Sequence, residues 1–190
     1  MKERNKINKM VVVAMLSSIS YLLLMLNFPI PAFPNFLTID FSEVPALIGA
    51  IIFGPMAGVI IEFIKNVLHY FINGSMTGVP IGDVANFIAG ILYIIPASFF
   101  FRKYRSMKGL TFGLIAGTII MAIILSLLNY LVFLPAYAYF MHFTLPNKLI
   151  VTAILPFNAI KGIIIMLLFV LLYPKLKVWI KNRMNLHDSK

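Results

Sequence analysis

Two carboxylates, Asp40 and Glu43, stand in a stretch rich in proline and phenylalanine, NFPIPAFPNFLTIDFSEVPALIG over 27–49. Later in the chain Asn158 precedes Lys161 by three residues, a spacing that puts both side chains on one face of a helix. Carboxylates accept hydrogen bonds, ammonium groups donate them and amides do both. These side chains can therefore bind a polar ligand. Whether they face water, lipid or the protein interior depends on the helices and loops that carry them.

Sequence patterns that carry catalysis are absent. There is no G-x-x-x-x-G-K-[ST] loop for ATP, no G-x-S-x-G and no H-E-x-x-H. The sequence has no cysteine, and its three histidines, His69, His142 and His187, are scattered. We expect no enzyme activity, no metal site and no cofactor.

Composition predicts a membrane protein. Of 190 residues 61% are hydrophobic and 12% charged, and the mean hydropathy is +0.96. Proline at Gly54-Pro55 divides one apolar run, because proline interrupts a helix. The apolar runs cover 10–26, 44–72, 84–101, 109–136 and 150–173. They predict an all-α integral membrane protein with six transmembrane helices in a single domain, 1–190. The second of these helices is shorter than the roughly 20 residues that are needed to span a membrane.

Basic residues predict the orientation. They gather before the first helix, between the fourth and fifth helices and after the sixth. They are Lys2, Arg4, Lys6, Lys9, Arg102, Lys103, Arg105, Lys108, Lys175, Lys177, Lys181, Arg183 and Lys190. Basic segments stay on the cytoplasmic side, so both termini are expected inside a multi-pass protein of the cell membrane. The net charge of +10 then matches anionic lipid headgroups, and nucleic-acid binding is not expected.

Polar residues within the predicted helices gather in the outer half of the membrane. They are Glu62, Lys65, Asn66, His69, Asp83, Asn86, Asn129, Asn158 and Lys161. Charged groups at such depth cost a few kcal/mol or more and usually face a cavity or one another. The set predicts a pocket open to the external medium. The alternative, in which Glu62 pairs with Lys65 and the asparagines only join helices, stays open.

The long outer loop between the first and second helices is a candidate cover for this pocket. Its prolines disfavour helix and limit the entropy that is lost on ordering, and its phenylalanine rings are unfavourable in water. These residues are Pro29, Pro31, Pro34, Phe28, Phe33, Phe36 and Phe41. A spacer between two helices is the alternative.

The one-sided distribution of polar groups favours a binding protein that needs a partner. A channel would carry polar groups through its whole depth, and a proton-driven carrier would place them near the midplane between repeats. Two segments with small residues four apart could contact another helix closely, Ala14–Ser18 and Gly113–Gly117. Packing within the chain is the alternative for both.

Three features together resemble a known family. They are the small-residue face of the first helix, the run DFSEVPALI...GP..G......KN.LH that begins at Asp40, and PFNAIKG over 156–162. The chain resembles the riboflavin-specific substrate-binding S component of energy-coupling factor (ECF) transporters. That resemblance implies capture of riboflavin from outside and docking on one transmembrane T component and two ATPase subunits.

The resemblance also implies roles for particular residues. The loop segment FLTIDFSEVPALIG gives Thr38 and Glu43 as ligand contacts, and PFNAIKG gives Asn158 and Lys161. Asn129 is a further candidate contact, because it lies at the same predicted depth in the membrane and its amide can donate and accept hydrogen bonds. Thr77 and Gly78 of the outer loop are candidates through their backbone groups. The family's docking pattern is Ala-x-x-x-Ala, and here Ala14 is followed by Ser18, which is also small. Open alternatives are an S component for another vitamin, a structural membrane protein without a ligand, and a stand-alone carrier.

Overall fold

The computed structural model describes residues 2–34, 36–75, 77–142 and 146–188, and side chains from 6 to 180 within these ranges. The side chains of Lys2, Arg4, Lys181, Arg183, His187 and Lys190 lie outside this description. The elements are α1 (Lys2–Met25), β1 (Phe28–Pro29), β2 (Thr38–Ile39), α2 (Glu43–Phe53), α3 (Pro55–Asn73), α4 (Ile81–Tyr104), α5 (Met107–Leu128), η1 (Asn129–Phe133), α6 (Leu134–Met141), η2 (Ile150–Ile154) and α7 (Leu155–Asp188).

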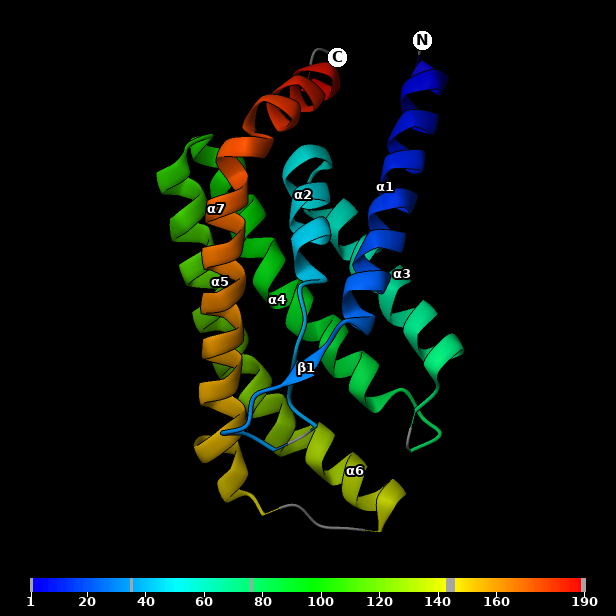
Figure 1. Ribbon diagram of the computed structural model, residues 1–190, viewed down its shortest axis with the longest axis vertical. Helices are drawn as coiled ribbons and strands as arrows, with labels where there is room; N and C mark the ends of the chain where they lie inside the picture. The colour runs from blue at the N-terminus through cyan, green and yellow to red at the C-terminus, as the bar shows by residue number, and fades with distance from the viewer. Residues whose placement is uncertain (1, 35, 76, 143–145, 189–190) are drawn as a thin grey trace.

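Within the described residues, five helical stretches are long and apolar enough to cross a membrane, which confirms the all-helical membrane class. They are Lys6–Met25, Pro55–Asn73, Ile81–Tyr104, Met107–Met141 and Ile150–Ile180. The two chain ends lie at one end of this bundle, while β1 and α6 lie toward the other (Figure 1).

The remaining apolar helix, α2, is short, as its sequence predicts. Its 11 residues extend roughly 16 Å at 1.5 Å per residue. It ends at Gly54, whose φ of 98° suits glycine. Ser98 of α4 donates to the Ala50 carbonyl at 2.8 Å, and Arg102 donates to the Ile51 carbonyl at 3.1 Å. Unsatisfied carbonyls are costly in an apolar interior, so α4 is what allows α2 to end inside the bundle.

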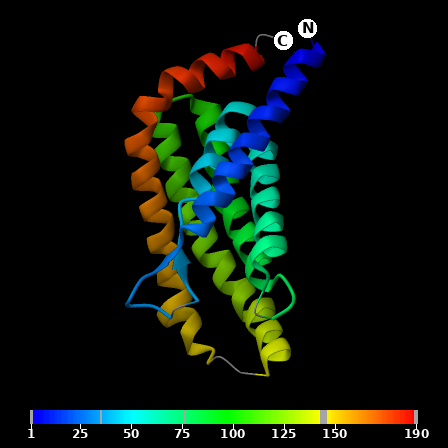
Figure 2. The same cartoon turned by 45° about the vertical axis from the view of Figure 1, so that its right-hand side comes forward.

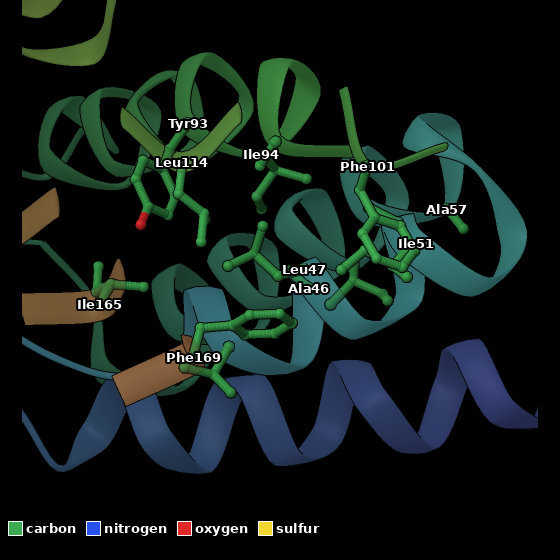
Figure 3. Close-up of a cluster of buried hydrophobic side chains, with 14 of the residues drawn as sticks. Ala46, Leu47, Ile51, Ala57, Tyr93, Ile94, Phe101, Leu114, Ile165 and Phe169 are labelled. Carbon is green, nitrogen blue, oxygen red and sulfur yellow. The ribbon is translucent and has the colours of Figure 1, made fainter. Parts of the chain in front are cut away.

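A closely packed apolar core joins α2, α4, α5 and α7. Leu47, Ile94, Leu114 and Phe169 are fully buried there and point toward one another (Figure 3). Glycines let α5 approach α4, since a Cβ at Gly117 would lie 2.5 Å from the carbonyl oxygen of Tyr93. A Cβ at Gly113 would lie 2.8 Å from the Cα of Ala97. The Gly113–Gly117 face thus serves packing within the chain.

The corresponding face of α1 points outward. Ala14 and Ser18 are both exposed, and the Ser18 hydroxyl donates to the Ala14 carbonyl at 3.1 Å. Val13, Leu16 and Ser17 occupy the buried face of the same helix. The Ala14–Ser18 face therefore stays free of helix packing within the described part of the chain.

Two features of the last helices were not anticipated. The segments η1 and η2 widen to π-helical hydrogen bonding, and each is followed by a Leu-Pro pair, at Pro135 and Pro156. A proline ring clashes with the carbonyl four residues earlier, and a locally wider turn relieves that clash. The last helix also continues beyond the expected end at 173, past Pro174 to Asp188. Its end crosses toward α1 at the end of the bundle where both termini lie (Figure 2).

Candidate ligand-binding site

The segment between α1 and α2 folds back on itself and covers the start of α7. Its two short strands pair antiparallel, with Phe28 opposite Ile39. The Phe33 ring meets Phe157 of α7 edge to face at 5.5 Å. Leu37 packs against an apolar cluster from α6 and η2. Both ribbon views place this segment beside the beginning of α7 (Figures 1 and 2).

The four phenylalanines of this segment divide into two kinds. Phe33 lies against α7, and Phe41 lies 6.1 Å from the ring of Phe28. Phe28 and Phe36 are exposed, at 45% and 53%. Phe33 therefore anchors the segment on α7, Phe41 packs against Phe28 within the segment, and Phe28 and Phe36 are presented at the surface.

Beneath this segment Lys161 meets two carboxylates. Its Nζ lies 3.0 Å from Oδ2 of Asp40 and 3.0 Å from Oε1 of Glu43. Asp40 directly follows β2, Glu43 is the first residue of α2, and Lys161 lies in the second turn of α7. All three side chains are buried. These contacts join the loop and α2 to α7.

Ser42 links these contacts to α3 and α1. Its amide donates to Oδ1 of Asp40 at 2.9 Å, and its hydroxyl donates to the same oxygen. Lys65 donates to the Ser42 hydroxyl oxygen at 2.5 Å, and the hydroxyl of Ser20 donates to the Ser42 carbonyl. One serine therefore connects three parts of the bundle.

Glu62 completes the cluster on α3. Its Oε2 lies 2.9 Å from the Nζ of Lys65, which lies 3.8 Å from Oε1 of Glu43. The carboxylate of Glu62 lies against α4, where a Cβ at Gly90 would come within 2.2 Å of it. Glycine at position 90 thus makes room for a buried carboxylate. Hereafter the charged cluster means Asp40, Glu43, Glu62, Lys65 and Lys161.

Buried charges are tolerated only when they are paired, and the pairing fixes the state of Asp40. Burial acts to raise the pKa of this carboxyl group, but the ammonium groups of Lys161 and Lys65 and the hydrogen bonds from Ser42 outweigh it. Together they lower the pKa of Asp40 to about 2. Asp40 is consequently an anion at neutral pH, fixed beside the Lys161 cation.

The side chains of the two asparagines expected at the site make the same kind of hydrogen bond. Asn158 is buried one turn before Lys161, and its amide donates to the Ile154 carbonyl at 2.8 Å. Asn129 opens η1 and donates in the same way to the Leu125 carbonyl at 2.8 Å. Each bond reaches back four residues along its own helix, which fixes the orientation of the amide.

The other expected residues lie apart from these contacts. Thr38 is half-buried and pairs with Pro29 in the small hairpin. Thr77 donates to the Val79 carbonyl at 2.6 Å, and the Gly78 carbonyl accepts a bond from Tyr70 at 3.1 Å. These last bonds stay within α3 and the turn that follows it. The structure thus brings Glu43 and Lys161 into direct contact and leaves Thr77 and Gly78 in a separate turn.

His69 and Asp83 form a second pair, separate from the charged cluster. Nδ1 of His69 lies 2.6 Å from Oδ1 of Asp83 and joins α3 to α4. No group of three or more His, Asp or Glu side chains suited to a metal ion occurs among the described residues.

Sequence reasoning placed Asp40 in the loop stretch and Lys65 among the polar residues of the outer half, but it missed that Ser42 joins them. The available signal was Asp-x-Ser before a helix, a pattern in which the carboxylate accepts from the amide two residues on. The contact between Asp40 and Lys161 has no such local signal, since 121 residues separate the two.

Residues 8–173 match the family described as ECF transporter, substrate-specific component. The chain belongs to this family. It is 52% identical to "Riboflavin transporter FmnP" of Bacillus subtilis (strain 168), covering 96% of this chain and 98% of that protein. It is 42% identical to "Riboflavin transporter RibU" of Staphylococcus aureus (strain TCH60), covering 96% and 100%.

A solved structure agrees with the fold. The structure described as "Structure and mechanism of the S component of a bacterial ECF transporter" has a TM-score of 0.81 and 42% identity, and covers 93% of this chain and 99% of its own. The chain is accordingly a multi-pass membrane protein, and its family supplies the substrate-binding part of a transporter, not an enzyme.

Proposed function

We propose that this protein captures riboflavin from the external medium and delivers it through an ATP-driven ECF transporter, as the membrane-embedded substrate-binding subunit. The relatives named riboflavin transporter support the ligand. The observation that carries the proposal is the buried α7 face of Asn158 and Lys161 beneath an aromatic loop. Riboflavin needs such a mixture, because its ring system is flat and largely apolar while its edge and ribityl chain are polar.

The proposed contacts divide by chemistry. Lys161 donates to a carbonyl of the ring system, and Asn158 and Asn129 donate to and accept from its edge. Glu43 and Thr38 bind ribityl hydroxyls. An ammonium group has three N–H donors. Lys161 donates one hydrogen bond to Asp40 and forms an ion pair with Glu43, so its N–H donors are not all used within the protein. Thr77 and Gly78 contribute backbone groups at the edge of the site, in an outer turn that would have to approach the ligand.

The proposed orientation puts both termini in the cytoplasm and the long loop outside. In this arrangement α2, the second helix along the chain, is counted with the five long stretches to give six membrane helices, and residues 1–190 form one domain. The junction of α4 and α5 and the later part of α7 lie toward the end of the bundle that holds the termini (Figure 1). Their exposed basic residues Lys103, Arg105, Lys175 and Lys177 support the orientation.

The proposed partners are one T component and two ATPase subunits. Ala14 and Ser18 form the docking face, which is supported by their exposure on a helix whose other side is buried. In vesicles that contain the complete transporter, Ala14→Trp should abolish ATP-driven riboflavin uptake while leaving riboflavin affinity unchanged. Loss of both properties together would contradict a docking role.

A titration of the purified protein tests the ligand. Riboflavin fluorescence should be quenched saturably, at sub-micromolar concentration, when the ring system stacks on aromatic side chains. Thiamine and biotin serve as competitors that should leave the titration unchanged. A folded protein that gives no saturable quenching would refute the proposed ligand.

A further inference from the structure

Hydrogen bonds and ion pairs run without a break from α3 to α7 through the loop. Lys65 donates to Ser42, Ser42 donates to Asp40, and Asp40 faces Lys161 at 3.0 Å. Asp40 is the one member of the charged cluster that belongs to the loop segment itself. It therefore joins the covering loop directly to Lys161, a proposed ligand contact.

Asp40 directly contacts the Lys161 ammonium group, at 3.0 Å. Its two carboxylate neighbours approach from different elements, the loop and α2, each at 3.0 Å. The hydrogen bond to Asp40 and the ion pair with Glu43 together restrict the orientation of the ammonium group and of its remaining N–H donors. With Glu43 alone, the flexible lysine chain has more arrangements, and the ligand must then order it on binding.

We propose that Asp40 is a positioning residue for ligand binding, which acts through Lys161 and is itself held by Ser42 and Lys65. This inference rests on the proposed function, because it assumes that Lys161 contacts riboflavin. Asp40 needs no contact with the ligand. Its carboxylate orients the lysine and fastens the loop to α7.

Asp40→Asn tests the proposal with little change of shape. We expect riboflavin affinity to fall about 10-fold, as for the loss of one charged hydrogen-bond partner. The matched control is Asp83→Asn, which removes a carboxylate from the separate pair with His69. Its affinity should stay within about twofold of the parent. Equal affinity in Asp40→Asn and the parent, or equal losses in both variants, would overturn the inference.

A double-mutant cycle separates positioning from a general structural effect. In a Lys161→Gln background, Asp40→Asn should change affinity by less than about twofold, because the group through which it acts is gone. A further loss of about 10-fold in that background would overturn the proposed route through Lys161. If the parent protein fails to bind riboflavin, the proposed function falls and the inference with it. If the parent binds and Asp40→Asn binds equally well, the inference alone falls.

Ser42→Ala covers the case in which Asp40→Asn does not fold. It removes the hydroxyl that joins Lys65 to Asp40 but leaves the Asp40 carboxylate and the Ser42 amide in place. We expect a weakening of about threefold, because Asp40 keeps its pair with Lys161 but loses one restraint. Unchanged affinity in this variant would overturn the proposal that Ser42 holds Asp40.

Discussion

The two ends of helix α2 lie in regions that are held together differently. Toward its C-terminal end, α2 packs in an apolar region around Leu47, Ile51 and Phe169, all fully buried (Figure 3). At its N-terminal end, Glu43 belongs to the charged cluster. The stability of the apolar region depends on how closely its side chains fit together, while that of the charged region depends on each ion having a partner of opposite charge.

This difference follows from the membrane environment. Lipid is as apolar as a leucine side chain, so the apolar region gains stability from close contact and from small residues such as Gly117. Buried charges gain nothing from shape alone and require opposite charges nearby. Changes in the apolar region should therefore alter stability, and changes in the charged region should alter ligand binding.

Lys161→Ala should have the largest effect. It removes a proposed ligand contact and leaves Asp40 and Glu43 without the cation that faces both. We expect riboflavin affinity to fall about 100-fold in a fluorescence titration. The control is Lys148→Ala, which changes an exposed lysine and should have no effect. An affinity within about twofold of the parent would refute the site assignment.

Phe169→Ala should lower stability without a specific effect on binding. The side chain is fully buried in the apolar region, and its loss leaves a cavity that costs roughly 3 kcal/mol. The melting temperature in detergent should fall, while riboflavin should still raise it in the variant as in the parent. Phe99→Ala, at a ring that is 58% exposed, is the matched control and should melt close to the parent. Loss of the ligand-induced rise would contradict the division between the regions.

Two glycines of neighbouring helices should give contrasting results. A methyl group at Gly117 would meet the backbone of Tyr93, which cannot move aside, so Gly117→Ala should cost about 2 kcal/mol. A methyl group at Gly90 would meet the carboxylate of Glu62, a side-chain end within the charged cluster. Gly90→Ala should therefore weaken riboflavin binding more than Gly117→Ala does. Thermal melting and titration of both variants decide this, and the reverse order would contradict the comparison.

The smallest effect should come from acid. Because the folded-state pKa of Asp40 is lowered from 3.8 to about 2, its ionisation stabilises the fold above a pH of about 4. That contribution is lost as the pH falls from about 4 toward 2. Between a pH of about 5 and 3, the melting temperature of the parent should fall more than that of Asp40→Asn. Parallel decreases would show that the Asp40 pair adds no stability.

Local patterns predicted the parts of the fold that depend on neighbouring residues. Apolar runs indicated the long helices, and Gly54-Pro55 indicated the break after a short one. The widened turns before Pro135 and Pro156 were not predicted, because proline can also end or kink a helix and packing decides among these outcomes. The small hairpin was missed for a related reason, since two paired residues per strand are too few for a periodic signal.

The site was predictable to a similar degree. The spacing of Asn158 and Lys161 indicated one shared face, and both side chains are buried on α7. The role of Asp40 could not be read from spacing, because its partner lies 121 residues away. The ligand contacts of Thr38, Asn129, Thr77 and Gly78 stay predictions.

The sequence by itself determined the environment and the available chemistry. Its composition required a membrane, and its few charges within apolar segments had to find partners, because unpaired ions are too costly there. Only the tertiary structure decided which partners they found. The same small-residue spacing is buried between helices at Gly113–Gly117 and exposed at Ala14–Ser18. Likewise, Asp40 pairs with Lys161 only because the folded loop brings its carboxylate to α7, and no local property of either segment specifies that contact.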